Sequence, residues 1–532
     1  MLGVLSGGGL ERRIPRTMSS QHPDNASVPA WANGEVIAGE AEVREAYEAY
    51  STYGCEEVMW DAEGKDIDPH VLRKLLSSYP DFFKERLIGR DIFLTFRIPN
   101  PYIEEAERKV FLEALQSIPR HNDVGRAFYG DDHGPCMFEV ILPFTTSHID
   151  LVRVKEAYKR AVVEPIEKMV DFRGHILREM VGDVLPKDIE VIPLIEDFES
   201  LVSVSSFLQK YIELLSPKYL RVFIARSDPA LMYGFIPATV IAKIALSECS
   251  AIENRMGIPI YPIIGSGCLP FRGHNSPSNV ERFVEEYVGV WTVTVQSGFK
   301  YDYKISEAAE AVSRLNKALP KGRAPPLEED IKELAISATL KLSQHYRECL
   351  ELVAQTVSQL STIVPPRRSR KLHIGLFSYS RQYQGVPLPR AIPFTALFYT
   401  LGLPPEIIGL RGLRALSEEE YDVVRELHRN MLHDLNFVGG FLCWENLSML
   451  AEGGEALIRL LGSDFVERFI PRYMEDVAVA EEMLGIRTGA RTLSERKYTN
   501  TAENFLISLL EGDLQEARSE LVRGGRLRKS LG

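Results

Sequence analysis

Short apolar runs recur along the chain and alternate with segments of helical periodicity. Nearly every run ends on a charged or polar residue. Continuous apolar runs separated by helices are typical of parallel strands that are buried on both faces. The eight runs are Val58–Asp61, Ile92–Arg97, Cys136–Thr145, Ile189–Asp197, Tyr219–Asp228, Ile258–Gly267, Thr292–Lys300 and Leu372–Arg381. They predict an α/β fold of the (β/α)₈ type, a TIM-type barrel.

The chain is longer than such a barrel requires, and the surplus has a helical pattern. Helices are expected over Ile305–Leu319 and Glu328–Ser361, after the seventh run, and over most of Ala391–Arg523. The second helix should stop by Pro365, since proline lacks the backbone donor that a helix needs. The barrel is thus expected to be elaborated by additional helices, especially after strand 7 and in the C-terminal part.

These patterns predict one domain over residues 18–532. Within it, the barrel is expected at about 55–385 and the helical C-terminal part at about 391–532. Residues 1–17 are expected to be a disordered extension or a start-site artefact, because Met18 is a second candidate start.

Composition narrows the possible partners. The net charge of −12 argues against nucleic acid, whose phosphates require a basic surface. No apolar run reaches the roughly 20 residues needed to span a membrane. The six cysteines are scattered without a CxxC pair, which favours reduced, buried thiols over a zinc site. We therefore expect a cytoplasmic protein without a nucleic-acid or membrane partner.

Two acids close consecutive apolar runs and are candidate metal ligands. Active sites of these barrels lie at the carboxyl ends of the strands. Glu196 and Asp228 end the fourth and fifth runs, and adjacent strands lie about 4.8 Å apart. Mg²⁺ is commonly held by one or two carboxylates with water and substrate oxygens. The alternatives are that Asp197 replaces Glu196 as the ligand, or that these acids are helix caps.

Arginines near the ends of four runs indicate an anion site. They are Arg97, Arg226, Arg272 and Arg381. A guanidinium binds phosphate or carboxylate through two parallel hydrogen bonds. The alternative for any one of them is a structural salt bridge to a nearby acid.

The residues alone do not decide the roles of two histidines and one charged segment. His22 stands in a polar loop before proline, where it is either a positioned acid or anion binder or an ordinary exposed histidine. His274 shares a loop with Arg272. The segment Asp61–Asp66, which includes Lys65, either lines the barrel mouth or is merely solvated.

Several segments together resemble one family. They are SSQHPDNA, VMWDAEGKD, LTFRIPNP, VIPLIEDFES, RVFIARSDPALMYG, LPFRGH, TVQSGFKYDY and LPRAIPF, in this order. From about Gln21 to at least Arg414 the chain resembles the archaeal-type phosphoenolpyruvate carboxylases. The resemblance implies an anaplerotic, carbon-fixing lyase. Phosphoenolpyruvate and bicarbonate would give oxaloacetate and phosphate through carboxyphosphate and a metal-stabilised enolate.

The resemblance also implies site residues and assembly. Glu196 and Asp228 would hold Mg²⁺ or Mn²⁺, and His22, Arg272 and Arg390 would be catalytic. Substrate-binding roles fall to Arg97, Arg226, Arg381, Lys65 and His274. A homotetramer is expected. The remaining alternative is another metal-dependent aldolase or lyase of the phosphoenolpyruvate/pyruvate barrel type, which would not need His22 or Arg390.

Two departures from the larger bacterial and plant enzymes carry expectations. A lysine of those enzymes is replaced by Leu231, so Lys65 or Arg226 must supply its charge. Their C-terminal motif appears only as Lys529–Gly532. We therefore do not expect the tail to reach the site.

Overall fold

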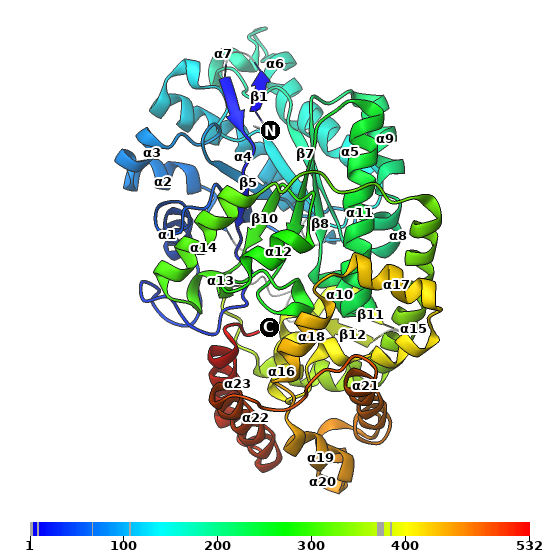
Figure 1. Ribbon diagram of the computed structural model, residues 1–532. Helices are drawn as coiled ribbons and strands as arrows, with labels where there is room; N and C mark the ends of the chain where they lie inside the picture. Colours follow the sequence, from blue (N-terminus) through cyan, green and yellow to red (C-terminus); the bar gives the residue numbers. More distant parts are fainter. Residues whose placement is uncertain (1–3, 8–9, 66, 106–107, 370–376, 384–385) are drawn as a thin grey trace.

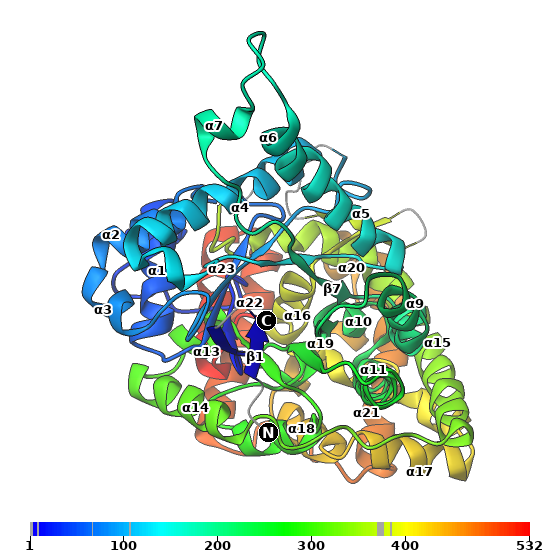
Figure 2. The same cartoon turned by 90° about the horizontal axis from the view of Figure 1, so that it is seen from above.

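Eight parallel strands form a closed barrel in the computed structural model, which describes residues 4–7, 10–65, 67–105, 108–369, 377–383 and 386–532. Viewed from above, the strands are surrounded by helices (Figure 2). The predicted fold class is confirmed. In spatial order the strands are β10 (Thr292–Val295), β3 (Thr17–Ser19), β4 (Glu57–Asp61), β5 (Phe93–Arg97), β6 (Glu139–Leu142), β7 (Glu190–Ile195), β8 (Leu220–Ala225) and β9 (Ile260–Gly265), and β9 closes on β10.

The barrel begins and ends earlier in the chain than predicted. Its first strand is β3, which pairs with both β4 and β10. The predicted eighth strand, Leu372–Arg381, is not part of the barrel. Residues 372–376 lie outside the described residues, and β11 (Phe377–Tyr383) pairs antiparallel with β12 (Val386–Pro389) in a separate sheet. The barrel strands thus span residues 17–295 instead of about 55–385.

The residues before Met18 are also structured where they are described. β1 (Val4–Gly7) and β2 (Leu10–Arg13) form an antiparallel hairpin where a disordered extension was expected. Ile14 is fully buried, and the Arg16 guanidinium donates to the Leu319 carbonyl at 2.7 Å. The chain therefore contributes to the barrel before Met18.

Ionic side chains close the amino ends of the barrel strands. Arg221 at the start of β8 is fully buried and pairs with Glu57 at 2.6 Å and Glu139 at 2.9 Å. These acids lie at the starts of β4 and β6. The predicted active site belongs to the opposite ends of the strands, their carboxyl ends.

Helices surround the barrel, and most of them pack on it through one large apolar core. They are α1 (Glu40–Ser51), α2 (Val71–Ser78), α3 (Pro80–Glu85), α4 (Arg108–Tyr129), α5 (His148–Tyr158), α6 (Glu164–Lys168), α7 (Leu177–Val181), α8 (Phe198–Val202), α9 (Val204–Leu215), α10 (Ser227–Tyr233), α11 (Phe235–Met256), α12 (Val280–Glu286), α13 (Ser297–Tyr301) and α14 (Ile305–Ala318). Among the described residues, α11 alone is long and apolar enough by itself to cross a membrane, but its apolar window is 83% buried inside the protein. It is packed as a core helix.

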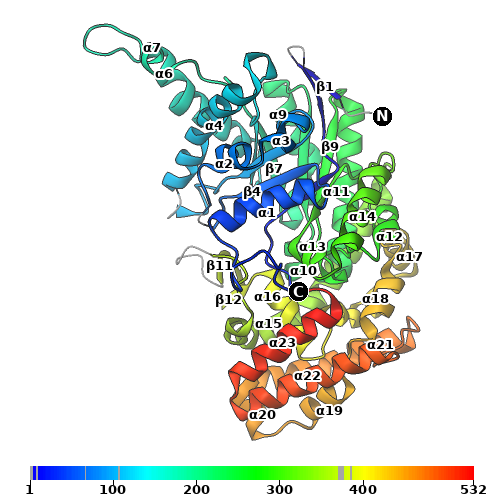
Figure 3. The ribbon, with the colours of Figure 1, turned by 90° about the vertical axis from the view of Figure 1, so that its left-hand side faces the viewer.

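A second group of helices, with its own apolar core, lies below the barrel in Figures 1 and 3. Its members are α15 (Glu329–Leu360), α16 (Ala391–Thr400), α17 (Glu418–Leu427), α18 (Met431–Gly439), α19 (Trp444–Glu452), α20 (Glu455–Leu461), α21 (Ile470–Glu482), α22 (Leu493–Glu511) and α23 (Leu514–Arg528). The predicted helices at Ile305–Leu319 and Glu328–Ser361 are confirmed as α14 and α15.

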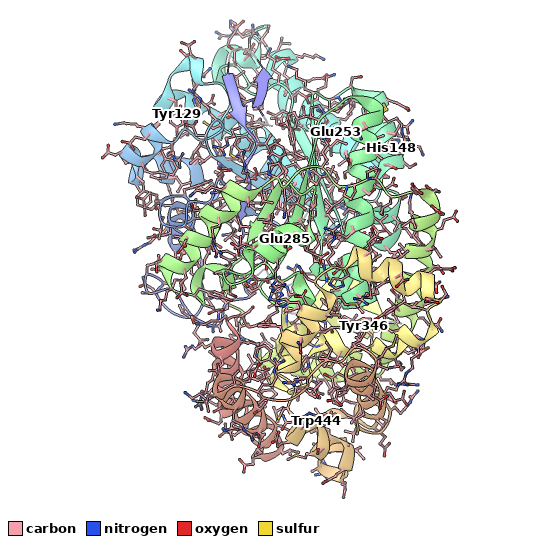
Figure 4. All side chains as sticks on the ribbon, in the orientation of Figure 1. Tyr129, His148, Glu253, Glu285, Tyr346 and Trp444 are labelled. Carbon is pink, nitrogen blue, oxygen red and sulfur yellow. The ribbon has the colours of Figure 1, made fainter. Side chains whose placement is uncertain are left out.

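The long helix α15 ties the two groups together. Its Tyr346 lies between the barrel and the lower helices in Figure 4. Tyr346 is buried and donates to the Leu231 carbonyl at 3.0 Å. A side chain at Gly234, where φ is +99°, or at Gly409, where φ is +84°, would collide with Tyr346. Glycine at both positions therefore permits this close packing.

Candidate active site

A polar cavity lies at the carboxyl ends of the barrel strands. Seven of the ten predicted site residues line it, and the lining residues are His22, Pro23, Asp61, Glu63, Lys65, Arg97, Glu196, Ser227, Asp228, Arg272, Arg390, Ala391 and Ile392. The cavity therefore gathers cations, carboxylates and one histidine from segments far apart in the sequence.

Acids on the β4 side of the cavity position two of its cations. Asp61 accepts two hydrogen bonds of 2.7 Å from Arg97 and one of 2.7 Å from Lys65. Glu63 pairs with Arg97 at 3.1 Å and lies 3.7 Å from Arg390. The segment Asp61–Asp66 therefore lines the mouth, with Asp66 itself outside the described residues.

Glu196 and Asp228 extend from neighbouring strands into this cavity. Glu196 follows the last residue of β7, Asp228 lies in the first turn of α10 after β8, and the two strands pair in parallel. The Phe144 amide donates to Glu196 at 3.0 Å. Asp197, the alternative ligand, caps α8 by accepting from the Ser200 amide at 2.8 Å and does not line the cavity. A pair of carboxylates fits a hard divalent cation.

His22 is half-buried and lies among cations that favour its neutral form. Its Nδ1 lies 2.8 Å from the Ser20 hydroxyl. Burial, followed by the charges of Arg97 and Arg272, lowers the pKa of His22 well below its usual value. A neutral imidazole is able to accept a proton in this pocket of mixed charge.

The loop that carries His22 is fixed from two sides. Asp302 accepts hydrogen bonds from the backbone amides of Ala26 and Ser27 at 2.8 and 2.6 Å. Arg367 donates to the carbonyls of Asn25 and Ala26 at 3.1 and 2.7 Å. The loop lacks regular structure, and these contacts hold its backbone.

Arg272 connects this loop to the C-terminal tail. Its guanidinium lies 3.2 Å from Asp24 and donates to the carbonyl of Gly532 at 2.7 Å. The Leu531 amide donates to the Asp24 carbonyl at 2.7 Å, and residues 530–532 are buried. The expectation that the tail does not reach the site is wrong, because Gly532 contacts a residue that lines the cavity.

Arg390 is the N-cap residue of α16, and its side chain also lines the cavity. Its Nε is buried and has no hydrogen-bond partner within the described part of the chain. A buried guanidinium N–H that donates no hydrogen bond costs free energy, and a bound acceptor would remove that cost. This favours an anion beside Arg390.

Arg226 does not line the cavity. Its guanidinium donates to the carbonyls of Phe271 and Phe235 at 3.2 and 3.0 Å, and to Thr239 and Tyr287 at 2.7 and 3.2 Å. It therefore holds α11 and the loop after β9 in place, and these contacts do not support the predicted substrate-binding role. Of the two candidates for the charge missing at Leu231, Lys65 is the one that faces the cavity.

The two other predicted substrate-binding residues are His274 and Arg381. His274 is not one of the residues that line the cavity, and its Nδ1 lies 2.6 Å from Asp434. Arg381 belongs to β11, and its side chain lies outside the described part of the structure.

Sequence reasoning missed other contributors to the site. They are Ser227 and Asp24, whereas Glu63 lies within the charged segment Asp61–Asp66 that was considered and Gly532 was expected to lie away from the site. Ser227 is adjacent to the predicted Asp228, so its position at a strand end was a usable signal. Asp24 carries no such signal, because only the folded chain brings it beside Arg272.

Comparisons with known proteins identify the family of the chain. Residues 14–532 match the sequence profile of the family described as phosphoenolpyruvate carboxylase. The phosphoenolpyruvate carboxylase of Metallosphaera sedula is 44% identical over 522 residues, covering 98% of this chain and 100% of its own. The phosphoenolpyruvate carboxylase of Caldivirga maquilingensis is 42% identical over 521 residues, which cover 98% of this chain and 100% of that protein. The phosphoenolpyruvate carboxylase of Picrophilus torridus is 40% identical over 525 residues, which cover 98% of this chain and 99% of that protein.

Proposed function

This chain belongs to the archaeal-type phosphoenolpyruvate carboxylases, and we propose how its own residues carry out the reaction of that family. The reaction joins phosphoenolpyruvate and bicarbonate to give oxaloacetate and phosphate, which makes the protein a carboxy-lyase. One observation supports the assignment of roles: His22, four cations and the acids Glu196 and Asp228 line a single cavity at the barrel mouth.

We assign the divalent cation, Mg²⁺ or Mn²⁺, to Glu196 and Asp228. Both offer only oxygen donors, which suits a hard cation. When bound, such a cation supplies positive charge that stabilises developing negative charge on substrate oxygen.

The cations of the cavity bind the anionic parts of the substrates. Arg97, Lys65, Arg272 and Arg390 come from β5, the segment after β4, the loop after β9 and the start of α16. Together they surround a phosphoryl group and a carboxylate from several directions. Charge that develops during phosphoryl transfer to bicarbonate is stabilised by groups that are already in place.

His22 then handles the proton of the intermediate. Attack of bicarbonate on the phosphoryl group gives carboxyphosphate and the enolate of pyruvate. Neutral His22 accepts the carboxyl proton as carboxyphosphate splits into carbon dioxide and phosphate. The burial of the site keeps water from the enolate carbon, which bonds to carbon dioxide to form oxaloacetate.

The test of this function measures phosphate release and oxaloacetate formation together. With phosphoenolpyruvate, bicarbonate and Mg²⁺, both products are expected in equal amounts. Omission of bicarbonate, or chelation of the metal, should abolish both. Phosphate release that is independent of bicarbonate would contradict the assignment. It would favour the alternative, another metal-dependent aldolase or lyase of this barrel type.

We also propose that the enzyme works in the cytoplasm as a homotetramer. The family resemblance supports the tetramer. The scattered cysteines support a reducing compartment, since all six are free and buried. Sedimentation of the purified chain tests the assembly, and a monomer would contradict it.

A further inference from the structure

Two histidines and one aspartate gather outside the catalytic cavity. His274 lies in the loop after β9, and His433 and Asp434 lie in α18. One potential ligand atom of each residue lies within 4.8 Å of the other two. His274 and Asp434 are buried, His433 is half-buried, and the catalytic cavity includes none of the three.

The donor set of this cluster differs from that of the catalytic acids. Two imidazoles and one carboxylate suit zinc and its neighbours, whereas Mg²⁺ prefers an all-oxygen site. Ligand atoms around a tetrahedral zinc ion lie about 3.3 Å apart, given zinc–nitrogen distances of about 2.0–2.1 Å. The ligand atoms of the three side chains are at most 4.8 Å apart, so their separations need to shorten by no more than about 1.5 Å. We propose that His274, His433 and Asp434 form a second metal site for a divalent transition ion, with Zn²⁺ as the best match.

The backbone presents His274 to α18. Its φ of +58° is uncommon for a residue with a side chain. The Leu269 carbonyl accepts from the His274 amide at 3.0 Å, and Asn279 donates to the His274 carbonyl at 2.9 Å. The ring of Phe437, also in α18, lies 5.0 Å from the imidazole. The imidazole is therefore held beside the two residues of α18 before any ion binds.

An ion at this site would join two parts of the molecule that meet at the barrel mouth. His274 is two residues from Arg272, and α18 belongs to the lower group of helices. A bound ion would thus fasten the arginine loop to α18. The competing explanation is a hydrogen bond between His274 and Asp434 at 2.6 Å that needs no metal.

Cobalt distinguishes these explanations, because Co²⁺ replaces zinc and absorbs visible light according to its ligands. The full-length protein is dialysed against Co²⁺ in a large excess of Mg²⁺, which occupies the all-oxygen site. We expect one retained Co²⁺ per chain, with visible bands, and displacement by Zn²⁺. His433→Ala and Asp434→Asn should each weaken Co²⁺ binding at least 10-fold.

The matched control is His345→Ala. His345 lies on α15 beside its own acid, Glu348, at 3.9 Å, so this variant should retain the ion. Asp434→Asn preserves size, and it decides the question if His433→Ala does not fold. The proposal is overturned if wild type retains no Co²⁺, or if both variants bind it as wild type does. Because the readout is metal content and not oxaloacetate, the result is independent of the proposed catalytic roles.

Discussion

Asp61 receives the Arg97 guanidinium in a two-point ion pair, with Nε and Nη2 each 2.7 Å from a carboxylate oxygen. The same carboxylate holds Lys65 at 2.7 Å and is 2% exposed. Burial alone would raise the pKa of Asp61, but Arg97 and Lys65 lower it far below its usual value. One acid therefore fixes the directions of two cations that line the cavity.

Asp61→Asn should weaken catalysis through the positions of these cations. The amide keeps the size of the side chain but leaves two buried charges without their shared partner. Loss of one member of such a pair costs at least about 2 kcal/mol, which corresponds to about a 30-fold fall in kcat/KM. We expect the KM for phosphoenolpyruvate to rise and kcat to fall, as steady-state kinetics will show.

The control for Asp61→Asn is Asp123→Asn on the surface of α4. Asp123 lies 3.4 Å from Arg126, and both side chains are exposed. This variant should keep the kinetic constants of the wild type. If Asp61→Asn lowers thermal stability but leaves both kcat and KM unchanged, then Asp61 is structural and does not position the substrate-binding cations.

The barrel was predictable from sequence where its strands are apolar and several residues long. β7 and β8 read as continuous buried runs, and the acids after them were correctly placed at one end of the barrel. β3 was missed because it is three residues long and contains Thr17 and Ser19. The run Leu372–Arg381 was mistaken for a barrel strand, because hydrophobicity does not reveal which partner a strand pairs with.

The candidate site divides in a similar way. Residues at strand ends, such as Arg97 and Glu196, are found by their position in the β–α pattern. Arg226 has the same position, yet its guanidinium is turned toward backbone carbonyls. The contact between Arg272 and Gly532 spans 260 residues. Side-chain direction and long-range contacts are properties of tertiary packing, and a strand pattern does not encode them.

His22→Asn should abolish oxaloacetate formation while metal binding is retained. Asparagine keeps a polar side chain but does not accept a proton at neutral pH, so carboxyphosphate would not be productively broken down. General base catalysis contributes about 100- to 10,000-fold, and we expect a loss of kcat in that range. Coupled oxaloacetate detection measures the rate, and Mn²⁺ titration by electron paramagnetic resonance measures the metal.

His148→Asn serves as the matched control for His22, since His148 lies on the outside of the barrel at the start of α5 (Figure 4). This variant should behave as wild type. Unchanged oxaloacetate production in His22→Asn would show that our assignment of His22 is wrong.

Removal of Leu531 and Gly532 should impair the site from a distance in sequence. The truncation deletes the carbonyl that accepts from Arg272 and the amide that donates to Asp24. A hydrogen bond to a charged group contributes about 1.5–3 kcal/mol, so kcat/KM should fall about 10- to 100-fold. Lys529→Asn is the control, because Lys529 is exposed and asparagine tolerates its φ of +66°. Wild-type kinetics in the truncated chain would show that the tail only packs beside the site.

Acid should destabilise the fold through histidines that are buried in the neutral form. Burial lowers the pKa of His121 to about 3 and that of His428 to about 4. Unfolding returns each to about 6.5, so below that pH the unfolded chain binds more protons and stability falls as pH falls. For His428 the loss continues down to about pH 4 and amounts to about 1.4 kcal/mol per pH unit. His428→Gln should therefore reduce the fall between pH 7 and pH 5 by about 2 kcal/mol, visible as a smaller shift of the urea midpoint. His148→Gln, at a half-buried residue on the outside of the barrel, should shift as wild type does. If the midpoint of His428→Gln also shifts with acid as that of wild type does, His428 is not held neutral in the folded protein.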